Sequence, residues 1–592
     1  MCGILGQINN KGAIDKSTFI KMLDTMVHRG PDGHGTYFSQ DNKIALGHRR
    51  LALIDLSDKA TQPLYNEDKT IWLTVNGEIY NYPVLRKTLQ QKGHTFSSNS
   101  DSEIIIHGYE EWGFDIVSKL KGMFAFGLLD EKKQLLFLAR DRFGIKPLYY
   151  FQSNDDFIFS SEIKGIVENP DVPRNIDFSS FSDFFTYRYI PSPKTIWKNI
   201  FKIPPANYLI YNFNGNASIH EYWKLESDNK SIPEKEAIEK VDYLLEKSIK
   251  GHILSDLPVG SFLSGGYDSS ALVYYMHRIH YPTSTFSIGF ENWEKSEHNY
   301  ADIVAKQFKT NLFSKIIGQS ELGLLDKLAY HYDEPIADIS IIPTYLVSEL
   351  AKKHVKAVLS GEGADEIFSG YTWHKTSIYE MNFWAKMYHF KNLFSHGKQK
   401  FSINEYSNAM AMGLFGKEEI NGLMHRDLHN NIPVDPFWFY RQHFKPELSP
   451  VKRFQFMDIK TFMGELVLTK VDRASMANSL EVRVPFLDHE LVEFLFSLSE
   501  NSYIRKRVQK FLLFENIKKD LPKVILERKK QGFVGPDSYY ENMQWYQNVL
   551  NDSKLVSDQI VNKHFIDHLL EVKDHWRLWK IVVMEKWYSK WV

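Results

Sequence analysis

The sequence is poor in cysteine: Cys2 is its only one in a chain of 592 residues. One cysteine excludes an intramolecular disulfide and any zinc site built from several cysteines, and it suits a reducing compartment. An excess of charge of one sign is lacking too, because 72 Lys and Arg residues against 73 Asp and Glu residues leave a net charge of -1. This balance gives no indication of a nucleic acid, an anionic membrane or a polycationic partner, so we expect small-molecule partners.

Long apolar runs are also absent. The sequence has no basic start followed by an apolar stretch, and no uninterrupted apolar run is long enough to span a bilayer. We therefore expect a soluble, cytoplasmic protein. Hydrophobic residues still make up 43% of the chain and aromatic residues 14%, which is enough to fill the cores of two or more domains.

The first part of the chain has the hydrophobic rhythm of strands. Short or alternating apolar runs such as CGILGQI, IWLTVNGEIYNY and MFAFGLLD predict strands, and YPVLRKTLQQKG and SEIIIHGYEEWG predict two helices. We expect a layered, largely antiparallel α+β domain. The segment 203–225 carries prolines and an Asn-Gly pair, as a linker or an edge hairpin would.

The second part alternates between predicted helices and strands: helix 234–253, strand 259–263, helix 269–280, strand 283–290. Alternation at this spacing predicts an α/β domain, with a parallel sheet, crossover helices and a helical C-terminal part. We place the boundary near residue 210, which gives domains 1–210 and 211–592.

Cys2 has two possible explanations. A free cysteine often behaves as a small buried hydrophobe. Methionine before a small residue is commonly removed, however, and Cys2 would then carry both a thiol and a free α-amine. An amine with a pKa of ~7.7 to 8.0 is a suitable base for its own side chain, so one residue could supply nucleophile and base.

Two nearby motifs carry groups that such a nucleophile needs. HRRLALID (48–55) offers an arginine able to fork a carboxylate, and VNGEIYN (75–81) offers a side-chain amide and a backbone N–H for one developing oxyanion. A solvated strand end and a hairpin turn are the plainer explanations of the same motifs.

Five motifs in order, MCGILG, HRGPDG (28–33), GHRRLALID, VNGEIYN and SDSE (100–103), resemble the class II glutamine amidotransferase domain. This is an N-terminal nucleophile hydrolase, so the resemblance implies an α-β-β-α sandwich, with Cys2 as nucleophile and its freed α-amine as base. It implies that Asn76 and Gly77 form the oxyanion hole, and we give HRGPDG a structural role as a turn. The implied glutamine-binding residues are Arg50, Leu51, Leu53, Asn76, Gly77, Glu78 and Asp101, with both leucines in the strand of Arg50.

LSGGYDSS (263–270) has the composition of a phosphate-binding loop. It follows a short apolar strand and opens a helix, so its glycine N–H groups, serine hydroxyls and helix N-terminus suit an anion. It lacks the lysine of a P-loop and the spacing of G-x-G-x-x-G. LSGEGADEIFSGY (359–371) adds carboxylates near this loop, which could bind magnesium or move protons; a plain turn is the alternative.

These motifs resemble the pyrophosphate loop of ATP pyrophosphatases, as found in the synthetase domain of asparagine synthetases. TKVDRASMANSLEVRVPFLD (469–488) and RKKQGF (528–533) also match, whereas Tyr267 stands where most relatives have Leu. The resemblance implies Mg²⁺ on Asp268 and Asp365, Glu362 orienting or deprotonating ammonia, and Lys510 neutralising pyrophosphate. The implied ATP-binding residues are Leu263, Ser264, Gly265, Gly266, Asp268, Ser269, Ile288, Ser360 and Gly361.

The resemblance covers nearly the whole chain and predicts a glutamine-hydrolysing asparagine synthetase. Glutamine hydrolysis at Cys2 would supply ammonia through an internal tunnel to an ATP-activated aspartate, with acceptor contacts expected in 333–348. Two alternatives stay open: the same machinery acting on a sugar acid or natural-product precursor, and a non-catalytic scaffold. A homodimer is a family expectation. His425 and His429 have metal-compatible spacing but no evident third ligand, so we assign them no metal.

Overall fold

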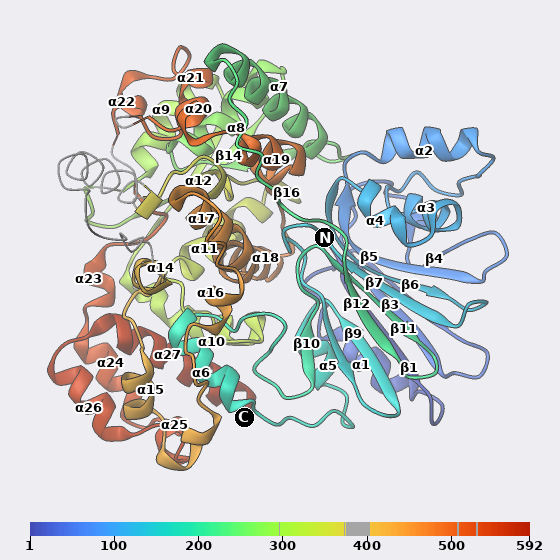
Figure 1. Ribbon diagram of the computed structural model, residues 1–592, viewed down its shortest axis with the longest axis horizontal. Coiled ribbons are helices and arrows are strands. Elements are labelled where there is room, and N and C mark those ends of the chain that lie inside the picture. The colour runs from blue at the N-terminus through green and yellow to red at the C-terminus, as the bar shows by residue number, and fades with distance from the viewer. Residues whose placement is uncertain (295, 372, 375–402, 506–507, 529–530) are drawn as a thin grey trace, which may run out of the picture.

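The structure, a computed structural model, describes residues 1–592 except 295, 372, 375–402, 506–507 and 529–530. Two six-stranded sheets form the N-terminal half (Figure 1). The order of the first sheet is β10 (Ile200–Lys202), β8 (Tyr149–Gln152), β9 (Asp156–Ser160), β1 (Gly3–Asn9), β3 (Ile44–Arg50), β2 (Gly33–Phe38). The order of the second is β12 (Ala217–Glu221), β11 (Asn207–Asn212), β7 (Leu135–Arg140), β6 (Gly122–Asp130), β5 (Ile71–Ile79), β4 (Leu64–Tyr65).

The two antiparallel sheets face each other across a shared core. Ile4 and Leu46 of the first sheet pack with Leu129 and Leu138 of the second, all of them buried. The outer face of the second sheet is covered by α2 (Tyr82–Gln91), α3 (Ile104–Trp112) and α4 (Ile116–Lys119), and that of the first by α1 (Lys16–Asp24) and α5 (Ile163–Val167) (Figure 1). The predicted α-β-β-α sandwich is thus confirmed, together with both predicted helices.

Segment 203–225 is the edge hairpin that its Asn-Gly pair indicated. β11 pairs with both β12 and β7, so the second sheet continues to Glu221. The boundary predicted near residue 210 falls inside β11, and the next helix, α7 (Glu234–His252), begins after a further stretch without strand or helix.

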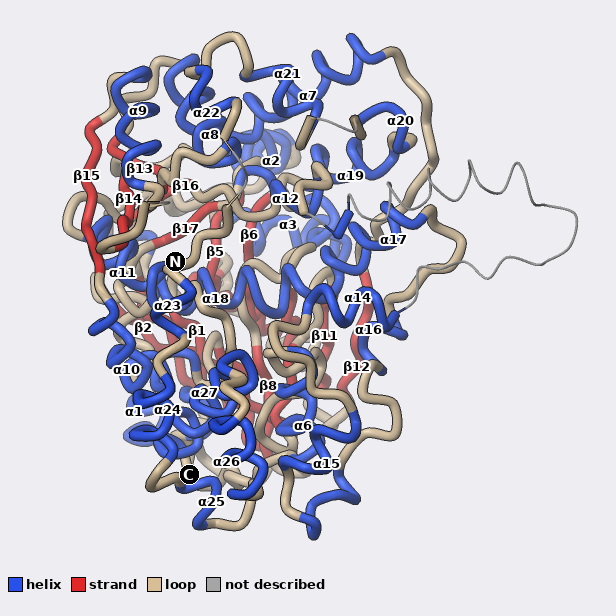
Figure 2. The backbone as a smooth tube through the Cα atoms, turned by 90° about the vertical axis from the view of Figure 1, so that its left-hand side faces the viewer, coloured by secondary structure: helices blue, strands red, loops and turns tan. Residues whose placement is uncertain are grey.

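The C-terminal half contains a parallel sheet, also as predicted. Its order is β15 (Asn311–Ile317), β14 (Ser284–Phe290), β13 (Val259–Phe262), β16 (Ala357–Leu359), β17 (Glu481–Arg483). On one face, α8 (Tyr267–Arg278) and α9 (His298–Phe308) pack together; on the other lie α11 (Ile341–Lys352) and α18 (Thr469–Met476) (Figure 2). Helices from α14 (Ile403–Met410) to α27 (His575–Trp591) form the predicted helical C-terminal part.

The packing of the two antiparallel sheets depends on one aromatic ring between two glycines. The Phe159 ring of β9 lies against Gly6 of β1 and against Gly127 of β6 in the opposite sheet. A Cβ added at Gly127 would lie 2.3 Å from this ring. Sheet-to-sheet contact here therefore requires glycine.

We predict that Gly127→Ala destabilises the protein by about 1–3 kcal/mol, because the added methyl overpacks the core between the sheets. The measurement is the thermal unfolding midpoint. Gly12→Ala is the matched control, since no heavy atom lies within 4 Å of its added Cβ. Equal midpoints for the two variants would contradict this account of the sheet packing.

Candidate active sites

The first candidate site is formed by the N-terminus and β5. The Cys2 backbone N–H donates to Asn76 Oδ1 at 3.0 Å, and both residues are buried. The other amide atom of this side chain, Asn76 Nδ2, is buried without a hydrogen-bond partner. Because buried donors are nearly always satisfied, this amide is suited to receive an oxygen from a ligand.

Gly77 follows in the same strand, where β5 and β6 approach closely. A Cβ at Gly77 would lie 2.2 Å from the Met123 carbonyl oxygen, so only glycine fits this position. Burial raises the pKa of the Cys2 thiol, while the N-terminal ammonium and a hydrogen bond from the Leu51 backbone oppose that shift. A buried thiol, an unpartnered amide and a glycine backbone therefore lie together.

Two buried carboxylates lie in the same region. Burial raises the pKa of Asp101 to about 6, and the Asp101 carboxylate accepts a 2.7 Å hydrogen bond from the Ile79 N–H. Burial, and then the neighbouring Glu481 carboxylate, raise the pKa of Glu78 well above its ordinary value. Glu78 Oε2 is buried and accepts no hydrogen bond, and its charged neighbour is the Arg483 guanidinium, 3.5 Å away.

Arg50 is held by backbone carbonyls rather than by an acid. Its guanidinium donates to the carbonyl of Ser57 at 2.9 Å and to that of Asp55. The predicted strand position of Leu51 and Leu53 is wrong, because β3 ends at Arg50. The backbone after Arg50 forms hydrogen bonds outside the sheet. The Leu53 carbonyl accepts one from the Asp256 N–H of the C-terminal half, at 2.9 Å.

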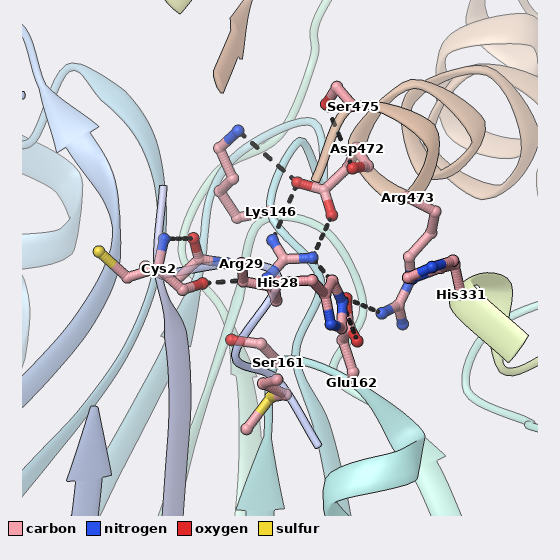
Figure 3. A network of polar contacts seen from close by, with 12 residues as sticks. Cys2, His28, Arg29, Lys146, Ser161, Glu162, His331, Asp472, Arg473 and Ser475 are labelled. Atoms are coloured by element: carbon pink, nitrogen blue, oxygen red, sulfur yellow. Dashed lines mark hydrogen bonds and ion pairs between the residues drawn. The ribbon is translucent and has the colours of Figure 1, made fainter. Parts of the chain in front are cut away.

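Arg29 of the HRGPDG motif does more than shape a turn, and sequence reasoning missed this (Figure 3). The fully buried guanidinium donates to the Cys2 carbonyl at 3.0 Å and to Glu162 Oε1 at 2.8 Å. It also forms a bidentate pair with Asp472 of α18, at 2.9 and 3.2 Å. One side chain therefore connects the residue that carries the thiol to the C-terminal half.

Strand β17 brings a second set of charges to the N-terminus. The Met1 ammonium lies 2.7 Å from Glu481 Oε2, with both side chains fully buried. Arg483 Nε pairs with Glu481 Oε1 at 2.6 Å, and Arg483 Nη2 lies 3.5 Å from Glu78 Oε2. The first candidate site is thus completed by residues of the other half.

The second candidate site is a cavity of about 380 Å³ in the C-terminal half. Its lining includes most of the predicted loop residues. Leu263 and Ile288 are buried in the structure and, like Gly265, do not line it. Gly265 has φ +71°, which favours glycine, and a Cβ there would meet Tyr300 at 2.5 Å. The predicted residues that line the cavity are Ser264, Gly266, Asp268, Ser269, Ser360, Gly361, Glu362, Asp365 and Lys510.

Three predicted residues converge at one point of this cavity. The Lys510 ammonium lies 2.8 Å from Asp365 Oδ1 and also pairs with Asp268 Oδ1. Burial opposes protonation, but the two carboxylates outweigh it and raise the pKa of Lys510. A pair of carboxylates that converge on one cation is a donor set that suits Mg²⁺.

Further contacts shape the loop. Arg528, from RKKQGF, donates to the Ser264 carbonyl at 3.2 Å and pairs with Glu297 at 2.6 Å. Lys529 and Lys530 of that motif lie outside the described residues. The Tyr267 hydroxyl donates to the Leu526 carbonyl, so the departure from the expected Leu ties the loop to the C-terminal part.

The lining of the cavity also includes Asp338, Ser340 and Lys470. Lys470 Nζ donates to Ser340 Oγ at 3.0 Å, and the Ser340 N–H donates to Asp338 Oδ1 at 2.8 Å. Burial opposes ionisation of Asp338, but Lys470 and Arg188 outweigh it and lower the Asp338 pKa. Asp338 and Ser340 belong to the predicted acceptor segment 333–348, and Lys470 of α18 brings a cation to them.

Comparison with known proteins matches the two halves separately. The glutamine amidotransferase domain family matches residues 1–223, and the asparagine synthase family matches residues 240–589. Glutamine-hydrolyzing asparagine synthetase 1 of Bacillus subtilis is 33% identical over 100% of this chain and 96% of its own length. The chain belongs to the asparagine synthase family.

Another relative is a putative glutamine-hydrolyzing asparagine synthetase 2 of Methanocaldococcus jannaschii. It is 35% identical over 82% of this chain and 100% of its own length. A solved glutamine phosphoribosylpyrophosphate amidotransferase from B. subtilis covers 49% of this chain and 67% of its own, with 20% identity and a TM-score of 0.29. That last similarity is too weak to support a conclusion, and the family membership rests on the sequence matches.

Two remaining expectations concern the pair His425 and His429 and the presence of membrane-spanning helices. His429 Nε2 lies 3.1 Å from the Met424 carbonyl oxygen, and His425 Nδ1 lies 3.5 Å from Asp427 Oδ2. Among the described residues, no helix is long and apolar enough to cross a membrane.

We predict that Arg29→Met lowers stability by about 3–5 kcal/mol, because it leaves buried carboxylates at the junction of the two halves without their shared cation. Thermal unfolding measures the effect. Lys132→Met is the control in the same half: Lys132 pairs with Asp68, and the two side chains are 66% and 51% exposed, so we expect little loss of stability. A smaller effect at Arg29 than at Lys132 would contradict the prediction.

Proposed function

We propose that the chain is a glutamine-dependent asparagine synthetase. It forms asparagine, glutamate, AMP and pyrophosphate from aspartate, glutamine and ATP. The observation that carries this proposal is the coexistence, in one member of the asparagine synthase family, of a buried thiol beside an unpartnered amide and a separate cavity lined by a glycine-serine loop.

In the N-terminal half, Cys2 attacks the side-chain amide of glutamine. Removal of Met1 would free the Cys2 α-amine, which takes the thiol proton as general base and passes it to the departing ammonia. Asn76 Nδ2 and the Gly77 N–H stabilise the oxyanion. Glu78 and Asp101 bind the α-ammonium of glutamine and Arg50 its carboxylate, with Leu51 and Leu53 beside them. Water then releases glutamate from the thioester.

In the C-terminal half, the 263–270 loop binds ATP through backbone N–H and serine groups, with Ser360 and Gly361 at the nucleotide. The acceptor carboxylate attacks the α-phosphorus and pyrophosphate leaves. Asp268 and Asp365 would hold Mg²⁺, which neutralises phosphate charge when bound. Lys510, already beside both carboxylates, would then pair with the departing pyrophosphate. Ammonia, oriented or deprotonated by Glu362, displaces AMP from the acyl-adenylate.

The acceptor is proposed to be aspartate. Lys470 suits its α-carboxylate and Asp338 its α-ammonium, because both line the cavity that also contains the phosphate loop. A sugar acid has no ammonium group to pair with Asp338, which favours the amino acid. We further propose, from the family, that the chain acts in the cytoplasm as a homodimer and divides between the glutaminase domain 1–210 and the synthetase domain 211–592.

The test is product analysis with aspartate, glutamine and Mg-ATP. We expect asparagine, AMP and pyrophosphate in equal amounts, measured by chromatography, and no turnover with sugar acids. Formation of ADP, or silence with aspartate and turnover with another carboxylate, would refute the proposed reaction.

We predict that Cys2→Ala abolishes glutamine-dependent synthesis and leaves ammonia-dependent synthesis within about twofold, because the second site has its own groups for adenylation. Initial rates with glutamine and with ammonium chloride measure this. Ser270→Ala, at the end of the phosphate loop, is the control and should retain glutaminase activity; circular dichroism checks that both variants fold. Loss of both activities in Cys2→Ala would mean that Cys2 is structural.

We predict that glutamine binding weakens as the pH falls below about 6. Burial raises the pKa of Asp101 to about 6, and only the ionised carboxylate attracts the α-ammonium of glutamine. Below that pH the KM for glutamine rises by up to about tenfold per pH unit, since the ionised share of Asp101 falls about tenfold with each unit. The KM for ATP is the internal control. A glutamine KM that stays flat from about pH 7 to about pH 5 contradicts the assignment of Asp101.

A further inference from the structure

A cluster of histidines and carboxylates lies on the outer helical layer of the glutaminase half. His94 follows α2, while His107 and Glu110 lie three positions apart on α3 and so share a helix face. Each of these three residues offers one ligand atom, and the three atoms lie within 4.8 Å of one another. In the part of the chain that the structure describes, this is the only such group.

The distances inside the cluster suit a small metal ion. Glu110 Oε2 lies 3.1 Å from His107 Nδ1 and 3.6 Å from His94 Nδ1. In a tetrahedral zinc site, with metal–ligand bonds of about 2.0–2.2 Å, neighbouring ligand atoms are about 3.4 Å apart. One of the two distances is shorter than that value and the other is longer, so small side-chain movements would give the spacing of a tetrahedral site.

Each ligand candidate also has a polar group behind it. His107 Nε2 lies 3.7 Å from Glu103 Oε1, and His94 Nε2 lies 3.6 Å from Glu111 Oε2. Asn66 Nδ2 donates to the second Glu110 oxygen at 2.9 Å. Metal-binding histidines typically donate their other ring N–H to a carboxylate, which fixes the tautomer and orients the ring.

Carboxylates surround the two histidines of the cluster. Glu103, Glu110 and Glu111 each place an oxygen within 3.7 Å of a histidine ring nitrogen. This negative charge favours a divalent cation at the cluster. The His107 side chain is 3% exposed and that of Glu110 24%, so an ion could enter from solvent on the Glu110 side.

We propose that His94, His107 and Glu110 form a structural binding site for a divalent transition metal of the Zn²⁺ type. The ion would fasten the turn after α2 to α3. The segment between these two helices, residues 92–103, contains Asp101 of the first candidate site and Asn99, whose N–H donates to Asp55 Oδ2 at 2.7 Å. The site therefore stabilises the segment that delivers Asp101, and it stands independently of the acceptor specificity proposed above.

The experiment is a Zn²⁺ titration of the full-length, chelator-treated protein by calorimetry, with Co²⁺ as a spectroscopic probe. We expect one high-affinity Zn²⁺ per chain, the visible bands of four-coordinate Co²⁺, and a higher thermal unfolding midpoint with zinc. His94→Ala and Glu110→Gln should each weaken Zn²⁺ binding at least tenfold and remove the zinc-dependent rise of the midpoint.

His220→Ala is the matched control, because His220 is exposed on an edge strand of the same half and lies outside the cluster. Circular dichroism without metal checks that each variant folds. The proposal is overturned if the wild-type protein binds no Zn²⁺ tightly. It is equally overturned if His94→Ala and Glu110→Gln bind Zn²⁺ with the affinity of His220→Ala, which would make the cluster an ion-pair network only.

Discussion

The Arg29 guanidinium is shared between the backbone of Cys2, Glu162 beside the first sheet, and Asp472 on α18. It is fully buried, so removing any partner leaves charge in a medium that solvates it poorly. The position of the thiol and the docking of the two halves are therefore fixed by the same group. Neither can shift without disturbing the other.

Strand β17 extends this connection to both sites. It pairs with β16, and the Ser360 N–H donates to the Arg483 carbonyl at 2.8 Å, directly before the Ser360–Glu362 loop of the cavity. The side chain of Arg483 pairs with Glu481 and Glu78, which lie at the first candidate site. The paired strands β16 and β17 therefore contact both candidate sites. A structural connection between the sites suits the proposed reaction, in which ammonia must reach an acyl-adenylate before water does.

Local patterns in the sequence were sufficient for the layers of the fold and for most of the residues that the structure brings together in the two candidate sites. Alternating apolar runs identified the strands, and the glycine-serine loop was placed correctly between β13 and α8, because these features depend on neighbours in sequence. The end of β3 was missed because Leu51 and Leu53 look like strand residues. In the structure the Leu53 carbonyl bonds to Asp256 of the other half and not to a neighbouring strand.

What could not be predicted depends on contacts between distant segments. HRGPDG looks like a turn, and nothing near it in sequence indicates that Arg29 reaches Asp472, more than four hundred residues away. Likewise, the spacing of His94 and His107 suggests no ligand set, because the loop after α2 must first fold back onto α3. Lys470 also looks like an ordinary helical lysine until the cavity is seen.

The central claim is that one chain passes nitrogen from glutamine at Cys2 to an acceptor in the second cavity. The most direct measurement supplies glutamine labelled with ¹⁵N in its amide, aspartate, Mg-ATP and an excess of unlabelled ammonium, and follows the asparagine by mass spectrometry. We predict that the ¹⁵N fraction of the asparagine exceeds that of the bulk ammonium, because ammonia from glutamine reaches the second cavity without first mixing with the solvent pool. Asparagine labelled only to the extent of the bulk ammonium would contradict the account.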